Sequence, residues 1–147
     1  KLALVKKDFD YIFIDCPPTL GILVVNALAA ADSVLIPMQC EPLTLYGVKH
    51  LLQVINLVRE DVNRDLKIEG VLRTMYDRRT KLSQEVSESI QQTFGNLVCS
   101  TIIYRHVKFA EGPIHEIPIN FYASKSPGAD EYRNLAEELL THESRKV

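Results

Sequence analysis

Short runs of apolar residues alternate along this chain with longer segments in which apolar residues recur every three or four positions. The short runs predict strands that are covered on both faces, and the longer segments predict helices with one apolar stripe. The expected strands are residues 11–14, 33–39, 67–76 and 98–103. The expected helices are residues 20–31, a segment from residue 44, residues 82–94 and a last helix that begins at Pro127.

Residues with special backbone properties mark several of the expected boundaries. Pro17 and Pro18 end the first strand, because proline has no amide hydrogen to donate to a ladder. Gly95 ends the third helix, and Ser126 provides the cap for the last one. Between the fourth strand and this cap, residues 104–126 are expected to form a long loop that carries a short turn or helix.

Strands that alternate with helices predict a parallel sheet with right-handed crossovers and flanking helices. The fold class is therefore α/β, and a length of 147 residues predicts a single domain over residues 1–147. Ligands of such sheets bind at the carboxyl ends of the strands. Four short segments are expected to meet at this edge: Asp15, residues 39–41, residues 75–77 and residues 104–106.

The composition narrows the function classes. The net charge of −2 excludes a generally basic nucleic-acid-binding protein, so any such site must be a local patch. No apolar run reaches the roughly 18 residues of a membrane span. The three cysteines are widely spaced, which is typical of reduced cytosolic thiols rather than of a disulfide or a metal site.

One carboxylate stands out, because Asp15 directly follows the four apolar residues of the first expected strand. This arrangement matches the Walker B pattern, in which a stiff strand holds a carboxylate that orients Mg²⁺ or a metal-bound water. On the pattern alone, Asp15 is equally well interpreted as the cap of the helix that begins near residue 19. The chain contains no G-x-x-x-x-G-K-[ST] loop, and therefore lacks the part of a nucleotide site that holds phosphates.

Two basic clusters follow the third and fourth expected strands. The first contains Asp77, Arg78, Arg79, Thr80 and Lys81, and the second contains Arg105, His106 and Lys108. Because both clusters lie at one edge of the expected sheet, together they predict a phosphate-binding patch. For each cluster taken alone, a solvated turn is the competing interpretation.

The chain resembles the ParA/Soj partitioning ATPases, which are deviant Walker ATPases related to MinD. The resemblance is carried by DYIFIDCPPTLGILVVNALAAADSVLIPMQCEPLTLYG, IEGVLRTMYDRRTKLSQEV, TIIYRHVKFAEGPIHEIPI and YASKSPGADEYRNLAEEL. It covers nearly the whole chain and corresponds to the carboxyl-terminal part of such a protein. It implies the carboxyl-terminal part of a P-loop NTPase fold, with the family's phosphate loop upstream of Lys1.

The resemblance implies an ATPase that binds ATP and Mg²⁺, closes as a homodimer and then binds nonspecific DNA. It gives Asp15 the catalytic and Mg²⁺-binding role of the Walker B residue. The residues that it places at the nucleotide are Asp15, Pro18, Met75, Tyr104, Arg105 and His106. The residues that it places at DNA are Arg78, Arg79, Lys81, Arg105 and Lys108. It also implies a ParB-like partner that stimulates hydrolysis, a cytoplasmic, nucleoid-associated location, and no membrane partner.

The chain departs from the family pattern at three of these positions. Tyr104 stands where the family has proline, His106 where it has asparagine, and Lys108 where it has arginine. Lysine keeps the charge of arginine but loses its forked donor geometry. The contacts to adenine and to DNA are therefore expected to differ in detail from those of the family.

Two other functions stay open. A MinD-like membrane-cycling ATPase would end in an amphipathic targeting helix, whereas the tail THESRKV has no bulky apolar face. A non-catalytic regulator that pairs with an intact ATPase subunit would explain the absence of a phosphate loop. Whichever function holds, we expect no ATP hydrolysis by this chain alone. We also expect the chain to dimerise or to be part of a longer chain, because an unpaired strand edge promotes association.

Overall fold

The structure is a computed structural model that describes the backbone of residues 2–144. The chain divides into two compact units, the first formed by residues 1–34 and 47–67 and the second by residues 35–46 and 68–147. The expectation of a single domain over the whole chain stays a prediction. Within the described residues, no helix is both long enough and apolar enough to cross a membrane.

The first unit contains two predicted helices. These are α2 (Ile22–Ala30) and most of α3 (Thr44–Asp61), and a short helix, α1 (Leu2–Val5), precedes them. The side-chain amide of Asn63 donates hydrogen bonds to the carbonyl oxygens of Leu28 and Ala31, at 3.0 and 2.8 Å, and so satisfies the last turn of α2. The buried apolar side chains of this unit are Val24, Leu28, Val48, Ile55, Val58 and Leu66.

The strand predicted over residues 11–14 does not form. Residues 11–17 are irregular, and the apolar side chains in this run are exposed, with Phe13 at 84%. A strand is stable only when a neighbour accepts and donates its ladder hydrogen bonds. None of the strands in residues 2–144 pairs with this run, so the prediction is wrong for this structure.

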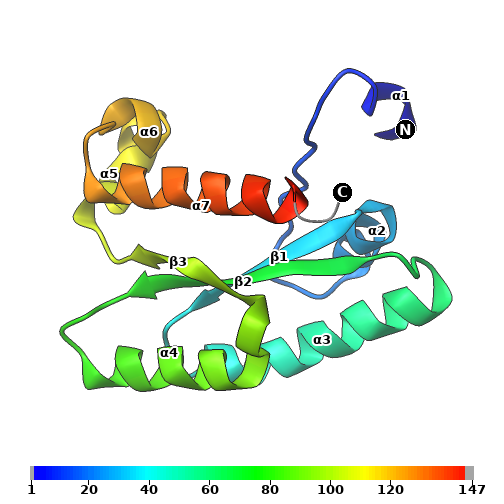
Figure 1. Ribbon diagram of the computed structural model, residues 1–147, viewed down its shortest axis with the longest axis horizontal. Helices are drawn as coiled ribbons and strands as arrows, with labels where there is room; N and C mark the ends of the chain where they lie inside the picture. Colours follow the sequence, from blue (N-terminus) through cyan, green and yellow to red (C-terminus); the bar gives the residue numbers. More distant parts are fainter. Residues whose placement is uncertain (1, 145–147) are drawn as a thin grey trace. The chain divides into compact units, whose positions relative to one another are not determined.

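Three strands form a sheet that belongs mostly to the second unit. They are β1 (Ser33–Gln39), β2 (Lys67–Tyr76) and β3 (Val98–Tyr104), and their order in the sheet is β1-β2-β3. β2 and β3 pair in parallel, and Figure 1 shows the three arrows pointing the same way. The predicted α/β fold with a parallel sheet is therefore confirmed.

Two helices of the second unit cover opposite faces of the sheet (Figure 1). They are α4 (Lys81–Phe94) and α7 (Pro127–Ser144). On the α7 side, one buried cluster joins the two strands β2 and β3 to the helix. Its members are Leu72, Cys99, Ile103 and Leu135, with Leu35, Phe109 and Leu139 packed against them. This cluster fixes α7 along β3.

The predicted boundaries of these helices are confirmed. The hydroxyl of Thr80 accepts a hydrogen bond from the Ser83 amide at 3.3 Å and caps α4. Gly95 ends α4 with a φ of 54°, in the region that favours glycine, and a 3-10 turn, η1 (Gly95–Leu97), follows. α7 begins at Pro127, and the hydroxyl of Ser126 accepts a hydrogen bond from the Ala129 amide at 3.3 Å.

The long loop predicted over residues 104–126 is mostly helical. It contains α5 (Val107–His115) and α6 (Ile119–Tyr122), and α5 ends where Glu116 adopts a φ of 53°. The sequence predicted less helix here than the structure has, because Gly112 and Pro113 interrupt the sequence pattern inside α5. Pro113 is the seventh of the nine residues of α5 and removes one of its internal hydrogen bonds, yet the helix forms.

Candidate functional site

The carboxyl ends of the three strands meet at one edge, as predicted. Tyr76 pairs with Tyr104 in the register of β2 and β3, and the Arg105 amide donates a hydrogen bond to the Tyr76 carbonyl at 3.0 Å. The Cys40 amide donates a hydrogen bond to the Thr74 carbonyl at 3.0 Å. The edge therefore brings together residues from the ends of β1, β2 and β3.

A β-bulge near the end of β2 sets the direction of the loop that carries the first basic cluster, residues 77–81. Arg73 pairs with Ile102 and Tyr76 with Tyr104, so β2 advances three residues where β3 advances two. Met75 lies within this step and adopts a φ of 53°, which costs a non-glycine residue about 1–2 kcal/mol. Such a bulge bends the strand and re-aims the residues that follow it. The loop that begins at Asp77 therefore leaves the sheet in a direction set by Met75.

An ion pair orders that loop. The Arg79 guanidinium donates to both carboxylate oxygens of Asp77, at 3.0 and 2.8 Å, and the Arg79 amide donates to one of them at 3.0 Å. These hydrogen bonds from Arg79 lower the pKa of Asp77 to about 2. The Arg79 side chain is nevertheless 86% exposed. Arg79 is thus held in position while its cation stays accessible to an anion.

Two further arginines lie at the same edge. The Arg78 guanidinium lies over the ring of Tyr104, 4.1 Å from its centroid, and this ring meets that of Tyr76 edge to face at 5.4 Å. Arg105 forms an ion pair with Glu41 at 2.8 Å, and both side chains are about half exposed. Arg78 and Arg105, which sequence analysis predicted at DNA, therefore gather around the paired ends of β2 and β3.

His106 lies against α7. One ring nitrogen of His106 lies 2.8 Å from a carboxylate oxygen of Glu131, and the other oxygen of Glu131 accepts a hydrogen bond from the Tyr104 amide at 3.0 Å. The ring of His106 also meets that of Phe109 edge to face at 5.3 Å. His106 therefore connects the site edge to the first turns of α7.

Lys108 of α5 interacts with side chains of α5 and α6, the two helices that follow β3. Its ammonium lies 3.6 Å from a carboxylate oxygen of Glu111 and 5.4 Å from the ring centroid of Tyr122. The Tyr122 hydroxyl donates a hydrogen bond to Glu111 at 2.5 Å, and this bond raises the pKa of Tyr122. The Lys108 side chain is 52% exposed, so it keeps a solvent-facing cation on α5.

Two predicted site residues lie in the first unit, whereas Lys81 lies in the second unit as the first residue of α4. The two are Asp15 and Pro18, on the irregular segment before α2, and both are exposed. The helix-cap interpretation of Asp15 is wrong, because the cap residue of α2 is Gly21 and no side chain caps this helix. Cys16 is also exposed, whereas Cys40 and Cys99 are buried, and all three cysteines are free.

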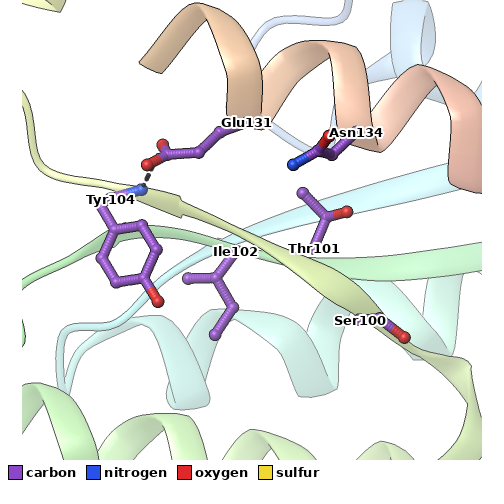
Figure 2. A pocket seen from close by; sticks show the side chains of 6 residues that line it. All are labelled: Ser100, Thr101, Ile102, Tyr104, Glu131 and Asn134. Carbon is purple, nitrogen blue, oxygen red and sulfur yellow. Dashed lines mark hydrogen bonds between the residues drawn. The ribbon is translucent and has the colours of Figure 1, made fainter. Parts of the chain in front are cut away.

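Two acidic residues of α7 that bind β3 were not predicted from the sequence. Glu131 and Glu138 accept hydrogen bonds from backbone amides of β3. Glu41, within the segment that was predicted at the edge, pairs with Arg105. No local pattern distinguishes such glutamates from solvated ones, because their partners lie far away in the sequence. A pocket of about 330 Å³ lies between β3 and α7 (Figure 2). It is lined by Ser100, Thr101, Ile102, Tyr104, Glu131 and Asn134.

In the part of the chain that the structure describes, no three His, Cys, Asp or Glu residues are grouped so that they could hold a metal ion. Mg²⁺ in proteins usually takes one or two carboxylates together with phosphate oxygens and water, and does not require a cluster of three such side chains.

Comparisons with known proteins show which family the chain resembles. A family model described as "AAA domain" matches residues 1–68. The chromosome-partitioning ATPase Soj of Treponema pallidum is 47% identical over 99% of this chain and 57% of its own length. The sporulation initiation inhibitor protein Soj of Bacillus subtilis is 49% identical over 96% of this chain and 56% of its own length.

A solved structure supports the same fold. Cobyrinic acid a,c-diamide synthase from Mycobacterium smegmatis, with bound ADP and magnesium, matches with a TM-score of 0.80 and 37% identity. The match covers 99% of this chain and 52% of that chain. The fold is therefore that of part of a P-loop NTPase. The chain spans about half the length of the curated relatives it matches, and it belongs to the Soj/ParA family of chromosome-partitioning ATPases.

Proposed function

We propose that this chain is the carboxyl-terminal part of a partitioning ATPase in which bound ATP controls the affinity for nonspecific DNA. The observation that carries the proposal is the gathering of exposed arginines at the carboxyl ends of β2 and β3. Arg78, Arg79 and Arg105 all lie there, and each is held by an aromatic ring or a carboxylate. Ordered cations at one sheet edge fit the spaced phosphates of a DNA backbone.

The base of ATP would bind at this same edge. Asp15 would supply the carboxylate for Mg²⁺, as the resemblance to the Soj/ParA family implies, and it lies exposed on the irregular segment before α2. Met75, Tyr104, Arg105 and His106 would surround the base, with Pro18 in the loop that follows the carboxylate. The bound nucleotide supplies the transferable phosphoryl group and the phosphate oxygens that complete the coordination of the ion. The 147 residues contain no phosphate loop, so we expect this chain alone to hydrolyse no ATP.

The DNA contacts would come from both basic clusters. Arg78, Arg79 and Lys81 would contribute from the loop and first turn of α4, and Arg105 and Lys108 from the end of β3 and from α5. ATP would close two copies as a homodimer and align these cations. A ParB-like partner would stimulate hydrolysis and so release the DNA, and the protein would work in the cytoplasm on the nucleoid.

The test is the salt dependence of DNA affinity in a protein of the relatives' length that carries this segment. The variant Arg79→Ala/Lys108→Ala removes one cation from each cluster. If both contact phosphates, the slope of log affinity against log salt falls by about two, and binding weakens by about tenfold or more. The control Arg64→Ala/Lys125→Ala removes the same charge from exposed positions outside the clusters and should bind as the parent does. An unchanged slope in the first variant would show that the patch is wrongly assigned.

Two competing functions receive less support. The solved structure carries the name of a cobyrinic acid a,c-diamide synthase, but its identity of 37% is below the 47–49% of the Soj proteins. A MinD-like membrane cycle would need a free amphipathic helix, whereas Leu135 and Leu139 of α7 pack into the core of the second unit. Sedimentation with anionic lipid vesicles tests the latter, and ATP-dependent co-sedimentation would favour it over DNA partitioning.

A further inference from the structure

β3 has one edge that does not face β2, because it lies at the end of the strand order among the described residues. Such an edge presents backbone donors and acceptors to which another strand can pair. Here three amides on β3 donate to carboxylates of α7. The Ser100 and Thr101 amides donate to the two oxygens of Glu138, at 2.6 and 2.9 Å, and the Tyr104 amide donates to Glu131 at 3.0 Å.

The spacing of the two glutamates matches the strand. Glu131 and Glu138 are seven residues apart, which is two turns of a helix and a rise of about 10 Å. The amides of Thr101 and Tyr104 are three residues apart, which is also about 10 Å along a strand. Figure 2 shows Glu131 reaching from α7 down to the Tyr104 amide. The two glutamates of α7 therefore accept hydrogen bonds from β3 at two points along the strand. Both contacts form only in the present alignment of α7 along β3.

α7 is fixed in this alignment by its apolar face. Leu135 lies between the two glutamates in sequence and is 7% exposed, within the cluster that also holds Cys99 and Ile103 of β3. Between the two contacts lies the pocket of about 330 Å³, so the edge is not otherwise filled there. Removing the carboxylates would leave the helix docked while freeing the amides of β3.

We propose that Glu131 and Glu138 form a carboxylate clasp that closes the outer edge of β3, and that opening the clasp turns this edge into a self-association surface for a second copy of the chain. The clasp works in two ways. It occupies the backbone donors that a new strand would need. It also places two carboxylates at the edge, which would repel the same two carboxylates of a second copy. Once the clasp is open, a two-fold axis can pair β3 with β3 in antiparallel fashion, since each copy then offers the same unpaired edge.

The test compares the molar mass of three proteins by light scattering, over a range of concentrations and without nucleotide. These are the full chain, the open variant Glu131→Ala/Glu138→Ala and the control Glu137→Ala/Glu88→Ala. The control removes the same charge from exposed positions, and the described part of the chain shows no hydrogen bond or ion pair for either side chain. We expect the mean mass of the open variant to rise at least about twofold above that of the parent, since the smallest assembly is a pair. The control should match the parent.

A proline distinguishes strand addition from unfolding. The Thr101 amide points to Glu138 and not to β2, so Thr101→Pro removes an outward donor while leaving the sheet intact. Added to the open variant, it should return the mass to that of the parent. If the open variant associates and Thr101→Pro does not reverse this, the association comes from unfolding and the proposal fails.

Amide hydrogen exchange gives the second readout. In the open variant, the Ser100 and Thr101 amides should exchange about tenfold or more faster than in the parent at concentrations below association. Faster exchange with no gain in mass at any concentration would show that the freed edge recruits no second copy. Unchanged exchange would show that the clasp does not exist in solution. The variant Glu131→Gln/Glu138→Gln, which keeps the side-chain shape, serves if the alanine variant does not fold, and it should show the same changes in smaller degree.

Discussion

Gly128 offers the sharpest test of how the site edge is packed against α7. Gly128 is the second residue of α7. Glycine in a helix is worse than alanine by up to about 0.5–1 kcal/mol, the full figure applying to the interior, so Gly→Ala is usually neutral or stabilising there. At Gly128 an added Cβ would lie 2.8 Å from Cζ of Phe109, 3.0 Å from its Cε1 and 3.1 Å from Cδ2 of His106. These ring atoms cannot move freely, because Phe109 also meets the ring of Tyr132 edge to face at 5.7 Å.

The sign of the effect follows from these distances. Overpacking a filled site costs about 1–3 kcal/mol, which exceeds the usual gain, so Gly128→Ala should lower the free energy of unfolding by about 1–2 kcal/mol. That corresponds to about 2–8 °C in the melting temperature of a chain of this size. Gly47 in α3 is the matched control, since a Cβ there meets nothing within 4 Å. Gly47→Ala should raise the free energy of unfolding by about 0.5–1 kcal/mol.

Urea unfolding followed by circular dichroism measures both variants against the parent. The quantity compared is the urea concentration at the unfolding midpoint. The comparison requires that the dependence of the unfolding free energy on urea has the same slope in each protein, so that a change in the unfolded state is not mistaken for a change in stability. Opposite signs for the two glycines would support the described packing of Phe109 and His106 on α7. If Gly128→Ala is as stable as the parent or more stable, these rings do not lie against the first turn of α7.

Two further predictions concern ionisable groups. Because hydrogen bonds from Arg79 lower the pKa of Asp77 to about 2, its carboxyl should titrate near that value in an NMR experiment, and Arg79→Ala should return it towards 3.8. The contribution of this pair to stability is therefore present above pH 4 and is lost as the pH falls towards 2; a midpoint near 3.8 in the parent would contradict the ion pair. Burial raises the pKa of the Cys99 thiol to about 11, whereas Cys16 is exposed, so a thiol reagent at pH 8 should label Cys16 first and Cys99 only on unfolding. Equal labelling rates in the folded protein would contradict the burial of Cys99.

Sequence analysis succeeded where the signal is local. The bounds of β2 were predicted as Lys67–Tyr76, where apolar and β-branched residues recur and the charged run that starts at Asp77 follows. Gly95 and the Ser126-Pro127 pair marked helix ends correctly, since caps depend on the backbone preferences of single residues. The common edge of the basic clusters followed from the rule that parallel strands end together.

Sequence analysis failed where structure depends on distant partners. Residues 11–14 have the composition of a strand, but a ladder requires a neighbour that the described chain does not provide. The bulge at Met75 depends on the register between β2 and β3, which no pattern within β2 contains. The hydrogen bond from the Ser100 amide to Glu138 joins residues 38 positions apart, so neither residue shows it in its local sequence.

The central claim is that bound ATP controls DNA affinity through the basic edge of the sheet. The most direct measurement is the fluorescence anisotropy of a labelled random-sequence duplex, titrated with a protein of the relatives' length that carries this segment, once with ATP and Mg²⁺ and once with ADP and Mg²⁺. The account predicts at least about tenfold tighter binding with ATP, a coupling of about 1.4 kcal/mol between the two ligands, and a strong loss of binding with added salt. Equal affinity in the two nucleotide states, or binding that salt does not weaken, would contradict it.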